Sequence, residues 1–103
     1  MDIKEELLMH WFHYYGKSIY TFAELETFQE SIEKYGAEKV LQIAVMSWAN
    51  GDGSPQIILM SIRKNILPEL FETLPDISEM DEEAKEQYEI LRDAFIAAIS
   101  ETF

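Results

Sequence analysis

Residues 37–50 read AEKVLQIAVMSWAN, and this stretch decides the fold that the sequence predicts. From Val40 to Trp48 only Gln42 and Ser47 are polar, so a helix over these residues has almost no polar face. A helix that is apolar on nearly all sides is buried inside a domain. We therefore predict a buried central helix here, with Trp48 in the core and the other helices packed around it.

Two capped helices precede this central helix. The sequence DIKE at 2–5 has a capping-box pattern, and helical apolar spacing then continues until Gly16. The sequence TFAE at 21–24 repeats the pattern and predicts a second helix over 22–35. Gly36 fits a left-handed cap between the second helix and the third.

The stretch after the central helix, ANGDGSPQIIL at 49–59, reads as a joint between two helices. Ser54 suits an N-cap, and Pro55 suits the first helical position, where its missing N–H does no harm. Residues 55–64 then fit a fourth helix. The same apolar run also fits a buried strand, because periodicity does not separate a short helix from a short strand.

Two more helices complete the predicted domain. Pro68 opens a short fifth helix and Pro75 closes it. The last helix is predicted to begin after Ser78, which pairs with Asp81 as a capping box. Its predicted apolar stripe consists of Met80, Ala84, Tyr88, Leu91, Phe95 and Ala98. The chain, 1–103, is thus predicted to be one all-α domain of five to six helices, with helices one, two and six around the third.

Charge is the most unusual feature of the composition. The 103 residues include 20 acids and 8 bases, a formal net charge of −12, and 11 of these acids with 2 of the bases lie from Glu69 onward. A general nucleic-acid binder needs Lys and Arg to neutralise phosphates, so direct binding of DNA or RNA is not expected. A protein partner with a basic surface, such as a nucleic-acid-binding protein, is expected instead.

The location is predicted from what the chain lacks. It has no cysteine, which removes disulfides and thiolate chemistry and is compatible with a reducing cytoplasm. MDIKEELL at 1–8 has acids where a secretory signal has bases, and no apolar run approaches the ~18 residues of a membrane span. We expect a cytoplasmic protein without membrane contact and without a cofactor.

The candidate binding site is an acidic face on the last predicted helix. At about 100° per residue, six carboxylates gather nearly opposite the apolar stripe: Glu79, Glu82, Glu83, Glu86, Glu89 and Asp93. They span about 21 Å, a length over which one DNA strand carries about six phosphates. Such a face fits a basic groove in place of a nucleic-acid backbone, as small inhibitors from phages and mobile elements do. The alternative is a solvated face without a partner.

The joint after the central helix suggests two further sites. NGDGSPQIILMS at 50–61 has oxygen-bearing side chains at the first, third and fifth positions of a calcium loop. However, Pro55 replaces the glycine of the sharp turn, and Ser61 replaces the bidentate glutamate. Ser54 also resembles the modified serine of acyl carrier domains, although their Asp-Ser-Leu pattern is Asp-Gly-Ser-Pro from Asp52 here.

The first predicted helix contains a possible metal triad, because Glu6, His10 and His13 lie on one side at i, i+4 and i+7. The triad lacks the paired histidines of a zincin motif, and histidines among aromatic residues are common at the rim of a core. No metal site is therefore predicted. The third and fourth helices also have the lengths of a helix-turn-helix, but the fourth is too apolar before Arg63 to read a groove.

Three functions are compatible with these features. The first is a small regulatory or inhibitory protein that binds a macromolecular partner through the acidic face, with mimicry of nucleic acid as one form. The second is an acidic carrier or small enzyme with a site near Asp52 and Ser54. The third is a structural subunit that dimerises through aromatic residues of the first helix. We favour the first, which is not an enzyme, and leave the oligomeric state open.

Overall fold

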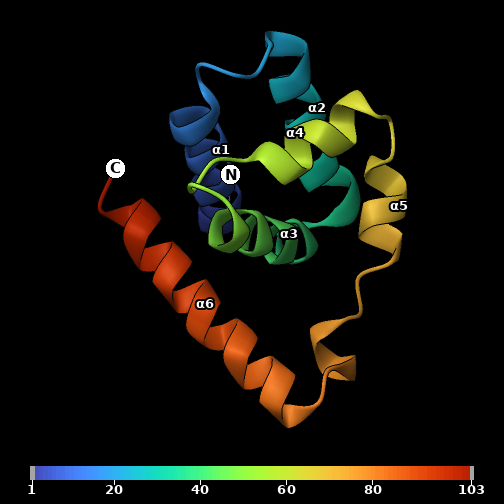
Figure 1. Ribbon diagram of the computed structural model, residues 1–103, viewed down its shortest axis with the longest axis vertical. Helices are drawn as coiled ribbons and strands as arrows, with labels where there is room; N and C mark the ends of the chain where they lie inside the picture. The colour runs from blue at the N-terminus through green and yellow to red at the C-terminus, as the bar shows by residue number, and fades with distance from the viewer. Residues whose placement is uncertain (1, 103) are drawn as a thin grey trace.

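The centre of the fold is α3 (Ala37–Asn50), which the other helices surround in the computed structural model (Figure 1). The structure describes residues 2–102. Five helices contact α3: α1 (Ile3–Gly16), α2 (Phe22–Tyr35), α4 (Gln56–Arg63), α5 (Leu67–Glu72) and α6 (Glu82–Ser100). A 3₁₀ helix, η1 (Ile77–Glu79), lies between α5 and α6. No strand occurs within residues 2–102, and the predicted all-α domain with a central third helix is confirmed.

α3 is buried through its middle, as its composition predicts. All six residues from Val40 to Val45 are buried, including Gln42, whose side-chain amide donates to the Pro75 carbonyl at 3.3 Å. Near the end of the helix, however, Met46 is 48% exposed and Trp48 is only half-buried. The last turn of α3 therefore reaches the surface, and the prediction that Trp48 lies in the core is wrong.

The fully buried tryptophan is Trp11 on α1. Its ring makes edge contacts with Phe28 of α2 and Phe95 of α6, at centroid distances of 6.3 and 5.6 Å. The indole Nε1 donates to the Gly53 carbonyl at 2.9 Å, so the buried N–H keeps a partner. One side chain thus connects three helices to the joint between α3 and α4.

The first three helices begin and end where the sequence predicts, although two caps differ. Asp2 caps α1 by accepting from the amide of Lys4 at 3.4 Å and not from that of Glu5. Gly36 has φ 91° and ψ 145°, and this ψ lies far from that of a left-handed helical cap. Gly36 ends α2 and also precedes α3 directly, so its extended ψ turns the chain from one helix into the next.

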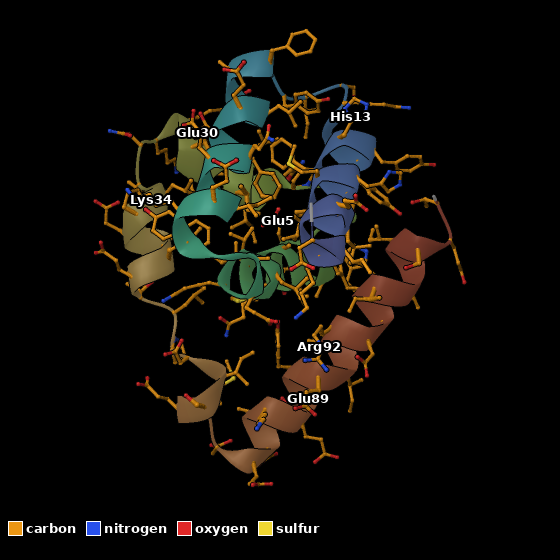
Figure 2. The ribbon with its side chains drawn as sticks, turned by 180° about the vertical axis from the view of Figure 1, so that it is seen from behind. Glu5, His13, Glu30, Lys34, Glu89 and Arg92 are labelled. Atoms are coloured by element: carbon orange, nitrogen blue, oxygen red, sulfur yellow. The ribbon has the colours of Figure 1, made fainter. Side chains whose placement is uncertain are left out.

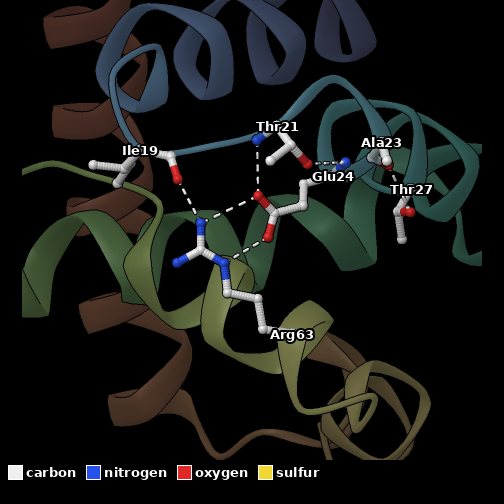
Figure 3. Close-up of polar contacts among 6 residues, drawn as sticks. All are labelled: Ile19, Thr21, Ala23, Glu24, Thr27 and Arg63. Carbon is white, nitrogen blue, oxygen red and sulfur yellow. Dashed lines mark hydrogen bonds and ion pairs between the residues drawn. The ribbon is translucent and has the colours of Figure 1, made fainter.

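A charged cluster joins α2 to α4 (Figure 3). Arg63 donates from Nε to Oε2 of Glu24 at 2.6 Å and from Nη2 to Oε1 at 3.1 Å, and Nη2 also donates to the Ile19 carbonyl. The same carboxylate accepts from the Thr21 backbone N–H at 2.8 Å, which completes the predicted capping box. The hydrogen bonds from Arg63 lower the pKa of Glu24 to about 2, although burial opposes this change.

α4 is a helix and not a strand, but it begins differently from the prediction. Pro55 occupies the N-cap position, and the Ser54 side chain makes no capping hydrogen bond. The Ser54 carbonyl accepts from the Ser47 hydroxyl at 3.2 Å, and the neighbouring Gly53 carbonyl accepts from Trp11. The predicted Ser54 N-cap is therefore wrong, because backbone carbonyls anchor this joint to the core while the Ser54 hydroxyl is buried.

Candidate functional site

The start of α6 decides which acids share its surface. Asp81 is the N-cap, and its carboxylate accepts from the Ala84 backbone N–H at 2.7 Å. The predicted start after Ser78 is wrong, because Ser78 lies in η1 and Met80, with φ −73° and ψ 146°, is extended backbone between η1 and α6. Glu79 is consequently outside α6 and does not belong to its acidic face.

Five of the six predicted acids share the outward side of α6: Glu82, Glu83, Glu86, Glu89 and Asp93. At about 100° per residue they occupy a sector of about 120° and a length of about 16 Å, shorter than predicted because Glu79 is not included. All are exposed except Glu89, which is half-buried. One DNA strand carries about five phosphates over this length, so the numbers of carboxylates and phosphates still agree.

An exposed isoleucine lies within this acidic sector. Ile90 is 63% exposed, and helical spacing places it between Glu83 and Glu86 around the helix, with Asp93 one turn further along. We call the five acids together with Ile90 the α6 outer face. Ile90 was not part of the predicted face, which was defined by its acids alone, although the same helical spacing contains this position.

The buried stripe of α6 is rotated from the predicted one. Tyr88, Phe95 and Ile99 are buried, whereas Leu91, predicted to be in the stripe, is 43% exposed. Phe95 fixes this rotation because its ring packs edge-on against Trp11 and Trp48. Of the predicted stripe, Tyr88 and Phe95 are buried, and Met80 lies outside the helix.

The N-terminal half of α6 projects from the body of the molecule (Figure 1). Residues 82–87 are all exposed, and burial begins at Tyr88, which is 8% exposed. Figure 2 shows Glu89 and Arg92 on α6. The Arg92 guanidinium lies 5.9 Å from the centre of the Tyr88 ring. Its Nη2 lies 3.5 Å from Oδ1 of Asp93. Burial raises the pKa of the Tyr88 hydroxyl to about 12, in keeping with its enclosed position at the base of the projecting half of α6.

The alternative sites are not assembled in the same way. Asp52 is exposed, but the Ser54 hydroxyl is buried, has no hydrogen-bond partner within residues 2–102, and is inaccessible to a modifying enzyme in this conformation. His10 Nε2 pairs with the Thr102 hydroxyl at 2.8 Å, and His13 Nδ1 pairs with the Tyr20 hydroxyl. Residues 2–102 contain no group of three or more histidine, aspartate or glutamate side chains arranged to hold a metal.

The aromatic surface predicted for α1 is also smaller than expected. Trp11 and Phe12 are fully buried, which leaves Tyr14, 44% exposed, and the half-buried Tyr15. The Tyr14 ring also contacts His10 and Lys17 of the same chain. A dimer through helix-one aromatics would therefore rest on little apolar area.

Comparison with protein-family models, with curated proteins and with solved structures finds no match to this chain. Within residues 2–102, none of the helices has both the length and the apolar content that are needed to cross a membrane.

Proposed function

We propose that the protein regulates or inhibits a macromolecular partner by binding it through the α6 outer face. The observation that carries this proposal is the position of Ile90, which lies among five carboxylates on a helix whose first turns are uncovered. Protein interfaces combine an apolar centre with a polar rim, and charges supply orientation and association rate. Ile90 gives this face an apolar side chain that a partner can cover, beside carboxylates that can orient the partner.

The partner in this proposal is a protein with a basic surface, such as a nucleic-acid-binding protein. The spacing of five carboxylates over about 16 Å supports mimicry of a nucleic-acid strand. The protein then competes with nucleic acid for a basic groove, and neither catalysis nor a cofactor is involved.

The test begins with affinity capture of the partner from cells that make the protein, followed by binding kinetics with two matched variants. The α6 triple variant replaces Glu82, Glu86 and Glu89 with Lys. The α2 triple variant replaces Glu26, Glu30 and Glu33 with Lys, which are exposed and have the same i, i+4, i+7 spacing. Both variants change the formal net charge from −12 to −6. Figure 2 shows Glu30 and Glu89 on distant parts of the molecule.

We expect the α6 triple variant to lose at least about tenfold in affinity, mainly through a slower association rate, while the α2 triple variant binds like the parent. Binding of the parent should fall as salt rises, and double-stranded DNA should displace the captured partner if the protein mimics nucleic acid. Equal binding of the parent and the α6 triple variant, or a loss of the same size in both variants, would overturn the proposal.

A further inference from the structure

A second surface of the molecule has the opposite chemistry to α6. In a chain with 20 acids, no Asp or Glu occurs from residue 53 to 68, and this segment contains α4 with Arg63 and Lys64 at its end. Met60 is 50% exposed, Ile57 is 37% exposed, and Ile66, just after the helix, is 44% exposed. We call Ile57, Met60, Lys64 and Ile66 the α4 outer face.

Shallow grooves flank Met60 on both sides. One has a volume of about 170 Å³ and reaches Ile19 and Arg63, and the other has about 180 Å³ and reaches Lys64 and Ile66. Methionine is unbranched and flexible, so it adapts to the shape of an apolar side chain that enters such a groove. The α4 outer face is therefore apolar at its centre and basic at one end.

The α6 outer face of another copy is the complementary surface. Ile90 has Glu86 and Asp93 at i−4 and i+3, whereas Met60 has Lys64 at i+4 and Arg63, which is already paired with Glu24, at i+3. Lys64 therefore supplies the positive charge beside Met60. Pairing two α4 faces brings cations together, and pairing two α6 faces brings carboxylates together. Among the three possible pairings of these two faces, the pairing of α4 with α6 brings apolar residues together and also places opposite charges side by side.

We propose that the protein self-associates, with the α6 outer face of one copy docked on the α4 outer face of a second copy. Met60 is 50% exposed and Ile90 is 63% exposed, so residues 2–102 of the same copy leave both faces open. This inference goes beyond the proposed function and does not rest on it. Because the α6 outer face is shared, a second copy competes with a basic partner for the same surface.

Size and charge set the strength of this contact. α4 is about 12 Å long, and one such contact involves far fewer than the 20–30 residues per side of a standard interface. Two reciprocal contacts in a closed dimer double the area and give a weak, reversible association.

The formal charge of −12 on each copy opposes this association, but the Debye length falls from about 30 Å at 0.01 M salt to about 8 Å at 0.15 M. Self-association should therefore increase with salt, whereas binding of a basic partner should decrease.

Sedimentation equilibrium of the full chain at about 0.01 and about 0.3 M NaCl tests the proposal. We expect a concentration-dependent rise in mass at high salt, and a loss of at least about tenfold in the association constant for Met60→Glu, which places an acid opposite acids. Met46→Glu is the matched control, because Met46 is 48% exposed on α3 and lies outside both faces. Circular dichroism confirms that the variants are folded.

A mixing experiment identifies the two faces. Ile90→Lys alone should not associate, but a mixture of Met60→Glu and Ile90→Lys retains one intact contact. In the other contact, the carboxylate introduced on α4 faces the ammonium group introduced on α6. We expect the mixture to recover association that neither variant has alone.

The outcomes separate this inference from the proposed function. Monomers at all salt concentrations, an equal loss with Met46→Glu, or no recovery on mixing would each overturn self-association through these faces. Met60→Glu should keep its binding to a basic partner, because α4 lies outside the α6 outer face. Failure of self-association and failure of the proposed function are therefore distinguishable.

Discussion

At the scale of single residues, the two tryptophans have different environments. Trp11 is fully buried and its N–H donates to the Gly53 carbonyl, whereas Trp48 is half-buried and its ring centroid lies 5.8 Å from that of Phe95. The cost of truncating a side chain follows the contacts and the cavity that it leaves. We expect Trp11→Ala to lower the free energy of unfolding by about 3–5 kcal/mol and Trp48→Ala by less than half of that. Urea unfolding of both variants measures the difference, and equal costs would contradict the assignment of Trp11 as the core tryptophan.

Glu24 gives the fold a dependence on acid pH. Its pKa is lowered from 4.5 to about 2, so the stability from its charged form is complete above about pH 5 and is lost as the pH falls through about 2. Glu24→Gln should lower the free energy of unfolding by about 1–3 kcal/mol at pH 7, because Arg63 and the Thr21 N–H lose a charged acceptor. The difference in free energy of unfolding between parent and variant should decrease as the pH falls from about 5 to about 2.

Urea unfolding of the parent and of Glu24→Gln across this pH range measures the difference in their free energies of unfolding. Glu26→Gln, two residues further along α2 and exposed, is the control and should leave stability within about 0.5 kcal/mol of the parent. A gap for Glu24→Gln that stays constant down to pH 2 would mean that packing, and not the ion pair with Arg63, accounts for its cost.

At the scale of elements, the cap of α6 tests where the acidic helix begins. Asp81 accepts from the Ala84 N–H, whereas Ser78 lies in η1 and makes no capping hydrogen bond. We expect Asp81→Ala to cost about 1 kcal/mol and to speed amide hydrogen exchange in the first turn of α6. Ser78→Ala should change neither stability nor exchange there. If Ser78→Ala has the larger effect, the helix starts earlier and Glu79 rejoins the acidic face.

Local patterns predicted those elements whose signals are local. The bounds of α2 follow from the Thr21–Glu24 capping box and from Gly36, which are readable within the helix itself. The start of α6 could not be predicted from the local sequence, because Ser78 and Asp81 are both possible N-cap residues. The extended backbone at Met80 excludes Ser78 and leaves Asp81 as the N-cap. That backbone belongs to a connection held on α3 by Gln42 and Pro75, a contact between distant parts of the chain.

The candidate site shows the same division between local and distant information. Five of its acids were predicted from helical spacing alone. The exposure of Leu91 was not predicted from helical spacing. It depends on the rotation of α6, which is set where Phe95 contacts Trp11 of α1 and Trp48 of α3. The opposite character of α4 also required the structure, since an apolar run suits a buried element equally well until Met60 and Ile57 are seen to be exposed.

At the scale of the whole molecule, charge and apolar area are divided between separate surfaces. The segment from Glu69 onward carries −9 of the formal −12, while residues 53–68 carry two bases and no acid. Figure 1 shows the N-terminal half of α6 extending away from the other helices that enclose α3. The strongly acidic face and the apolar, weakly basic face therefore belong to different helices of one small domain, α6 and α4.

The net charge of −12 also acts on the fold as a whole, because like charges held in a folded domain repel one another and salt screens that repulsion. We expect the free energy of unfolding of the parent to rise by about 1 kcal/mol between low and physiological salt, equivalent to about 4–8 °C in Tm. Repulsion within a molecule of this size grows roughly as the square of its net charge, so both triple variants, at −6, should show about a quarter of that rise. Thermal unfolding of the three proteins at about 0.01 and about 0.15 M NaCl, at a concentration too low for self-association, gives the comparison. A reduction confined to the α6 triple variant would show that repulsion within α6, and not the net charge, opposes folding.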